Sequence, residues 1–133
     1  MSFLIDTHVF IWALTDTRRL SSTARGVITN PRNELYISAV TFWEIAIKLR
    51  SKRLAPIGHE PSTLIKAAET MGFTPIPITP EDATTHAELT ENTHFDPFDR
   101  MLIWQAIQRD MTLVSGDPEF KKFKSDGLRL LWK

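Results

Sequence analysis

The chain has 133 residues, of which 42% are hydrophobic and 24% charged, which is the composition of a folded globular protein rather than a disordered one. Its length allows one hydrophobic core, so we expect a single domain over residues 1–133. Sixteen basic and sixteen acidic residues leave no net charge, which removes any argument for nucleic-acid binding from overall charge, and the absence of cysteine excludes disulfides, thiolate metal sites and cysteine nucleophiles.

The first half of the chain alternates between short apolar runs and helical patterns. In order, we predict a strand at 3–6, helices at 9–14 and 22–28, a strand at 34–38 and a helix at 39–52. Ser38 is placed to cap the last of these helices, whose end carries several lysines and arginines that suit the helix dipole. Gly26 weakens the prediction of the second helix.

The second half continues the alternation. After a loop at 56–61, we predict a helix at 62–71, a strand at 73–78, helices at 80–89 and 97–110, and strands at 112–115 and 128–131. Prolines interrupt the strand at 73–78, so it should lie at a sheet edge or begin late. Thr79 and Asp96, each followed by proline, are helix caps, and residues 118–126 are a polar, lysine-rich stretch between the last two strands.

Strands that alternate with helices predict an α/β fold. We expect a three-layer α/β/α sandwich with a mainly parallel sheet of four to five strands. Ligands of such sheets bind beyond the carboxyl ends of the strands, where the strand order reverses. No apolar stretch is long enough to span a membrane, and no signal peptide is apparent, so we expect a cytoplasmic protein without membrane contacts.

Four carboxylates stand where one element changes to the next, and together they suggest a metal site. They are Asp6, Glu44, Asp99 and Asp117. Like charges gathered in one cleft repel one another and lose hydration, and a divalent cation offsets that cost. Oxygen ligands without sulfur favour Mg²⁺ or Mn²⁺, and one or two such ions would support cleavage of a phosphodiester by water.

Each carboxylate also has a structural alternative. Asp99 shares the most apolar stripe of its helix, which turns it towards the sheet, but a first-turn acid can instead assist the Asp96 cap. Glu44 could form an exposed pair with the lysine four residues on, and Asp6 and Asp117 could cap the helices that follow them. The hypothesis of a metal site therefore depends on the set rather than on any single member.

Other side chains give weaker signals. The four histidines lack zinc-protease spacing, and Ser115 has no evident base, so we interpret it as an orienting hydroxyl or a strand-end residue. The basic runs at 48–53 and 121–124 are either solvated helix faces or phosphate-binding surfaces. Most aromatic residues lie in apolar stripes and should be core, although exposed ones near a cleft could contact a partner or stack on unpaired bases.

Four stretches of the sequence carry a family resemblance: Leu4-Ile5-Asp6-Thr7-His8, residues 38–44, residues 94–102 and Leu113-Val114-Ser115-Gly116-Asp117. In these stretches, in length and in the order of elements, the chain resembles the PIN-domain nucleases, and among them the VapC-type ribonuclease toxins of bacterial and archaeal toxin–antitoxin operons. The segment His-x-Asp-Pro-Phe-Asp-Arg at 94–100 is specific to one branch of that family.

The resemblance implies a PIN-like fold and a Mg²⁺- or Mn²⁺-dependent endoribonuclease. Its catalytic and metal-binding residues would be Asp6, Glu44, Asp99 and Asp117, with Asp6 and Asp99 as principal ligands. Supporting roles would fall to Thr7, Ser115, His94, Asp96 and Arg100. The family usually carries Thr-Ala-Asp or similar where this chain has Ser115-Gly116-Asp117, which leaves the direction of the Asp117 side chain open.

The resemblance also implies partners: an RNA substrate, a second copy of the chain in a homodimer, and a small VapB-like antitoxin. The C-terminal segment of the antitoxin would enter the acidic groove and block the metal site with arginine or lysine. A competing interpretation is a nuclease-inactive PIN module that binds RNA or serves as an assembly scaffold. An acidic-pocket phosphatase is a third, opposed because Asp6-Thr7-His8 lacks a second acid two residues on.

Overall fold

The computed structural model describes residues 1–133, and its centre is a sheet of five parallel strands in the order β3-β2-β1-β4-β5. The strands are β1 (Ser2–Ile5), β2 (Glu34–Ser38), β3 (Phe73–Ile76), β4 (Thr112–Val114) and β5 (Arg129–Leu131). This confirms the predicted α/β class and parallel sheet. The proline-containing strand β3 lies at an edge, where its missing amide hydrogen disrupts no inner ladder.

Helices fill the connections between the strands. The α-helices are α1 (Thr7–Thr15), α2 (Ser22–Thr29), α3 (Ala39–Arg50), α4 (Leu64–Thr70), α5 (Pro80–Thr85) and α6 (Pro97–Gln108), and the 3-10 helices are η1 (Thr17–Arg19), η2 (Pro61–Thr63), η3 (His86–Glu88) and η4 (Pro118–Asp126). The predicted caps are present: Ser38 accepts a hydrogen bond from Val40 N, Asp96 accepts one from Asp99 N, and Thr79 begins a capping box.

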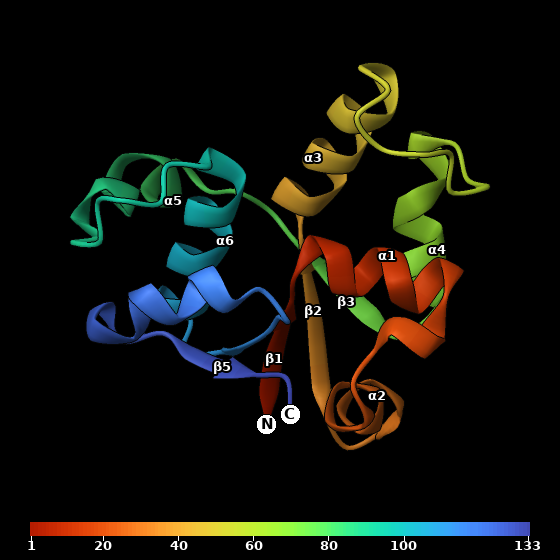
Figure 1. The fold of residues 1–133 in the computed structure, drawn as a ribbon, viewed down its shortest axis with the longest axis horizontal. Helices are drawn as coiled ribbons and strands as arrows, with labels where there is room; N and C mark the ends of the chain where they lie inside the picture. The colour runs from red at the N-terminus through yellow and green to blue at the C-terminus, as the bar shows by residue number, and fades with distance from the viewer.

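The sheet separates two hydrophobic cores, because successive residues of a strand point to opposite faces. Phe3 and Ile5 of β1 face α1, α2 and α4, whereas Leu4 faces α6 and η4. Figure 1 shows α1, α2 and α4 on one side of the sheet, α5 and α6 on the other, and α3 beyond its carboxyl edge. The three-layer sandwich is therefore confirmed.

The structure corrects several predicted boundaries. The helix expected at 39–52 ends at Arg50, and Lys52 adopts a positive φ of 60°. The helix expected at 62–71 begins with the 3-10 turn η2, and the one expected at 80–89 divides into α5 and η3. Residues 118–126, predicted as a polar connection, form the 3-10 helix η4, because Phe120 and Phe123 both reach the core from a three-residue spacing.

The strand order reverses between β1 and β4, which pair in parallel, so that Ile5 lies opposite Val114. The chain leaves β1 into α1 on one face and leaves β4 into η4 on the other. Residues that follow these two strands therefore meet at the carboxyl edge, where ligands of such sheets bind. No helix combines the length and the apolar character that a membrane crossing needs.

Candidate functional site

Asp6 is a buried carboxylate at the end of β1 and the cap of α1. Its Oδ1 accepts a hydrogen bond from Thr7 N at 2.8 Å, and its Oδ2 accepts one from Ser115 Oγ at 2.8 Å. Only 3% of the residue is exposed. Burial, with the nearby charges of Asp99 and Glu44, raises the pKa of Asp6 from its ordinary 3.8 to about 7, although the two hydrogen bonds oppose the rise. Asp6 therefore caps α1 and also interacts electrostatically with Asp99 and Glu44.

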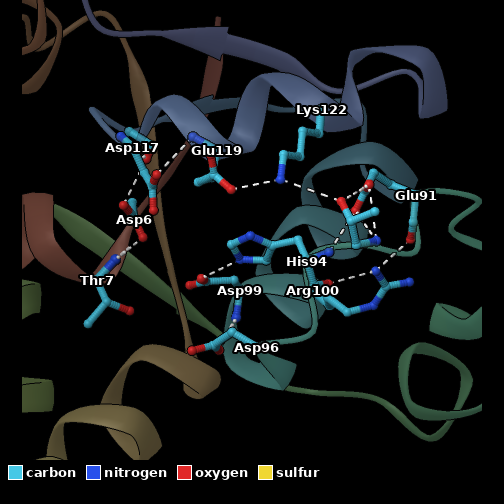
Figure 2. Close-up of polar contacts among 12 residues, drawn as sticks. Asp6, Thr7, Glu91, His94, Asp96, Asp99, Arg100, Asp117, Glu119 and Lys122 are labelled. Carbon is cyan, nitrogen blue, oxygen red and sulfur yellow. Dashed lines mark hydrogen bonds and ion pairs between the residues drawn. The ribbon is translucent and has the colours of Figure 1, made fainter.

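Asp99 lies in the first turn of α6, and its side chain is not used as a cap. Asp96 accepts the hydrogen bond from Asp99 N at 3.0 Å, so the Asp99 carboxylate is left to pair with His94 Nε2 at 2.9 Å (Figure 2). Burial raises the pKa of Asp99 from 3.8 to about 6, and the charges of Asp96 and Glu44 add to the rise. The His94 contact lowers it in part.

Glu44, on α3, forms the predicted lysine ion pair and is also part of the acidic site. It forms an ion pair with Lys48, Nζ to Oε2 at 2.6 Å, as the four-residue spacing suggests. The carboxylate is not exposed, however, because only 3% of the residue is accessible. Its charge contributes to the raised pKa of both Asp6 and Asp99, which places the three acids in one electrostatic group.

Asp117 follows β4 and caps η4, with its Oδ1 accepting a hydrogen bond from Glu119 N at 2.9 Å. Its own backbone N donates to Ser115 Oγ at 3.1 Å, and the same hydroxyl donates to Asp6. Asp6 and Asp117 line one hollow of about 190 Å³, together with His8, Trp12, Gly116 and Pro118. Ser115 is therefore the link between the two strand-end acids.

The loop before α6 is held so that His94 faces Asp99. Arg100 donates from Nη1 to the carbonyl oxygens of Glu91 at 2.7 Å and His94 at 3.0 Å, and Glu91 accepts from His94 N at 3.0 Å (Figure 2). The His94 ring also packs edge-on against Phe120 and Phe123 of η4. Arg100 thus acts on the start of α6 through the backbone of the loop.

Asp6, Glu44 and Asp99 form one electrostatic group, and Asp117 shares a hollow with Asp6, but no group of three or more histidine, aspartate or glutamate side chains is close enough to hold one metal ion. Each carboxylate instead has a donor of its own: Ser115 for Asp6, Lys48 for Glu44, His94 for Asp99 and the Glu119 amide for Asp117. Buried carboxylates that repel one another suit a hard cation, which keeps several waters and needs only one or two of them. The ligand set of four stays a prediction.

The PIN domain family model matches residues 3–125, which is most of the chain. The chain belongs to the PIN domain family. This PIN domain is 27% identical over 132 residues to ribonuclease VapC22 of Mycobacterium tuberculosis, a match that covers 97% of each protein.

Solved structures agree with the fold of this PIN domain. The crystal structure of VapBC2 from Rickettsia felis, bound to a DNA fragment from its promoter, contains a chain that matches with a TM-score of 0.70 and 17% identity over 100% of both chains. A chain of VapBC-1 from nontypeable Haemophilus influenzae matches with a TM-score of 0.68 and 14% identity, over 98% of this chain and 97% of that one.

Two side chains at the site of this PIN domain are absent from the sequence-based prediction. Thr41 Oγ1 lies 3.0 Å from Thr7 Oγ1, and both residues are buried. Trp132 covers Gly116, where an added Cβ would lie 2.8 Å from the ring. Thr41 precedes Glu44 by one helical turn, a spacing that could have identified it, whereas the place of Trp132 depends on the pairing of β4 with β5.

Proposed function

We propose that this PIN domain is a metal-dependent endoribonuclease of the VapC type. The observation that carries the proposal is the pair Asp6 and Asp99, two carboxylates from different parts of the chain whose pKa values are both raised by burial, with the charge of Asp99 adding to the rise at Asp6. Clustered buried carboxylates destabilise a fold unless a bound cation or a proton neutralises their charge, so such a cluster indicates a functional site. The family match and the likeness to a ribonuclease support nuclease chemistry.

We assign Asp6 and Asp99 as the principal ligands of Mg²⁺ or Mn²⁺, with Glu44 and Asp117 completing the acidic site. These oxygen donors fit a hard cation. When bound, the ion would lower the pKa of an attacking water and offset the charge that develops on the scissile phosphate. The acids lie at the strand-order reversal, at the edge of the sheet where ligands of such folds bind.

The surrounding residues orient these acids. Ser115 donates to Asp6 and accepts from the Asp117 amide, so it fixes both strand ends relative to each other. His94 directs one oxygen of Asp99, and Asp96 and Arg100 hold the helix start and loop that carry this pair. Thr7 joins α1 to α3 through Thr41. Such contacts limit the reorganisation that binding of a cation and a phosphate requires.

We further propose that a VapB-like antitoxin inhibits the enzyme, because solved structures with this fold are VapBC complexes. An arginine or lysine of the antitoxin would pair with the same carboxylates, in place of the donors that now hold Glu44 and Asp99. The single domain over residues 1–133, a homodimer and a cytoplasmic location complete the proposal.

The test is cleavage of RNA by the purified full chain with Mn²⁺, with the cut positions mapped by sequencing of RNA ends. Asp6→Asn and Asp99→Asn should each abolish cleavage while the circular dichroism spectrum stays unchanged. Asp110→Asn is the matched control, because the Asp110 carboxylate is 87% exposed and pairs only with Arg129. Mn²⁺ alone should raise the unfolding midpoint of the unsubstituted chain and have less effect on Asp6→Asn.

Cleavage that persists in both Asp6→Asn and Asp99→Asn would refute the assignment of the acids. RNA binding without any cleavage by the unsubstituted chain would instead favour the nuclease-inactive module. That alternative has one observation in its favour, since the acids are already engaged by protein donors rather than arranged as three ligands of one ion.

A further inference from the structure

A second pocket, which we call the lysine pocket, adjoins the hollow that contains Asp6 and shares Asp117 with it. Its volume is about 530 Å³, and it is lined by Ser115, Gly116, Asp117, Pro118, Lys121, Lys124, Leu130, Trp132 and Lys133. Gly116, Asp117 and Pro118 also line the hollow that contains Asp6. The lysine pocket is therefore continuous with the acidic site along one stretch of backbone after β4.

Three lysines line this pocket beside a single acidic residue, Asp117, and none of the three is in an ion pair. Lys121, Lys124 and Lys133 form no ion pair, whereas the intervening Lys122 pairs with Glu119 at 2.7 Å. The 3-10 geometry of η4 explains the division, because residues three apart lie above one another. Phe120 and Phe123 share the core face, and Lys121 and Lys124 share the face that lines the pocket.

Trp132 forms the aromatic wall of this pocket, and packing holds it in place. The ring lies so close to Gly116 that a Cβ there would be 2.8 Å from Trp132 Cε2. Its centroid is 6.0 Å from that of Trp12, and the Trp132 carbonyl accepts a hydrogen bond from Ser21 Oγ. The wall continues from Trp12 to His8, whose ring centroids are 6.1 Å apart, in the hollow beside Asp6.

We propose that the lysine pocket binds the nucleotide of a single-stranded RNA segment that lies next to the cleaved phosphodiester. Lys121 and Lys124 contact the phosphates, and the base lies against Trp132. This inference rests on the proposed function, in which the scissile phosphate would lie beside a cation held by Asp6 and Asp99. Unpaired lysines beside a fixed aromatic ring are the combination with which proteins bind unpaired nucleic acid, since the cations attract the backbone and every base has a π-face.

Continuity with the acidic site favours a nucleic-acid strand over an acidic peptide. A strand that enters the acidic site must carry its neighbouring phosphates past Asp117, and the lysines offset the repulsion between those phosphates and the carboxylates. An acidic peptide would use the lysines but gain nothing from a base-sized contact with Trp132.

The first experiment measures binding of a fluorescein-labelled single-stranded oligoribonucleotide to the full chain by anisotropy, with EDTA present to prevent cleavage. The double substitution Lys121→Gln with Lys124→Gln should weaken binding about tenfold at about 0.15 M salt. It should also make the negative slope of log association constant against log salt concentration less steep by about 1.4, as expected for the loss of two phosphate contacts. The matched control is Lys52→Gln with Lys66→Gln, two exposed lysines away from both pockets that make no ion pair. The control should bind as the unsubstituted chain does.

The second experiment tests the base contact. Trp132→Ala should weaken binding roughly 5- to 100-fold, whereas Trp132→Tyr, which retains a ring, should keep most of the affinity. A series of oligoribonucleotides, each lacking the base at a different position, locates the base that contacts Trp132. Loss of the base at one position, adjacent to the mapped cut, should weaken binding to the unsubstituted chain. Loss of the same base should not weaken binding to Trp132→Ala any further. Trp132 also packs on Gly116, so Trp132→Ala could fail to fold. In that case the double lysine variant and Trp132→Tyr test whether the pocket binds RNA.

The outcomes separate this inference from the proposed function. If the lysine variant binds with the affinity and salt slope of its control, or if polyglutamate competes as well as RNA, the lysine pocket does not bind an RNA strand. If the unsubstituted chain cuts RNA with Mn²⁺ in that case, the endoribonuclease assignment survives alone. If no RNA is cut while the lysine and tryptophan variants lose binding as expected, the pocket stands as an RNA-binding site, whereas the enzymatic proposal and the placement beside a cleaved phosphodiester both fail.

Discussion

Replacement of Asp6 by asparagine should stabilise the metal-free protein at neutral and alkaline pH. The folded pKa of about 7 lies above the ordinary 3.8, so the folded chain holds this proton more tightly than the unfolded one. Stability is therefore full below about pH 4 and falls as the pH rises to about 7, as the buried group becomes charged. The difference of about three pKa units, at about 1.4 kcal/mol each, sets an upper limit of about 4 kcal/mol on the stability that is lost when Asp6 ionises. Asn keeps the bond from Thr7 N but weakens the one from Ser115, so we expect a net gain of roughly 2–3 kcal/mol.

Urea unfolding with EDTA at about pH 8 and about pH 4 measures this effect, since the free energy of unfolding should rise in Asp6→Asn at the first pH and change by less than about 1 kcal/mol at the second. Asp110→Asn is again the control, because its exposed pair with Arg129 should contribute at most about 1 kcal/mol at either pH. A loss of stability in Asp6→Asn of equal size at both pH values would refute the argument that an uncompensated buried charge destabilises this site.

Two further substitutions test the packing around the site and the structural ion pair on the opposite side of α6. Gly116→Ala should lower the free energy of unfolding by roughly 1–3 kcal/mol, because its Cβ would lie 2.8 Å from the Trp132 ring, whereas Gly26→Ala, with nothing within 4 Å, should be neutral or gain up to about 1 kcal/mol. Calorimetry measures the free energy of unfolding of the two glycine variants, and equal losses in both would contradict the close contact between Gly116 and Trp132. Arg109→Gln should cost roughly 1–3 kcal/mol at neutral pH, because it leaves Asp82 buried without its bidentate partner. Burial opposes ionisation of Asp82, but hydrogen bonds from Arg109 and Gln105 hold its pKa at about 2, so the pair stabilises the fold above pH 3.8 and this is lost as the pH falls through about 2. A cost that is the same in urea titrations at about pH 2 and pH 7 would show that the charge of Asp82 is not involved.

The fold was predictable from local signals. Short apolar runs and helical patterns, together with caps at Ser38, Thr79 and Asp96, define most elements without reference to the tertiary structure. The lysine-rich helix η4 was missed because its polar sequence conceals the apolar pair Phe120 and Phe123, whose spacing of three suits a 3-10 helix. The breaks at η2 and η3 depend on tertiary contacts that no local pattern contains.

The site was predictable in part. Strand ends and the helical wheel predicted that Asp6 and Asp99 face the same region, and the charge of Asp99 does contribute to the raised pKa of Asp6. For Glu44 the choice between a lysine pair and a buried acid could not be made from spacing, because both are true. The contact of His94 with Asp99 depends on the geometry of the loop before α6, which local sequence patterns do not determine.

The central position of β1 has a consequence for synthesis of the protein. This strand is made before the other four, yet one of its two neighbours, β4, is more than a hundred residues later in the chain, and the Ser115 to Asp6 hydrogen bond spans 109 positions. A nascent chain on the ribosome therefore displays a half-paired strand until β4 has been made. Products that terminate before Ser115 have no assembled acidic centre, so the cell meets this centre only in chains that extend past it.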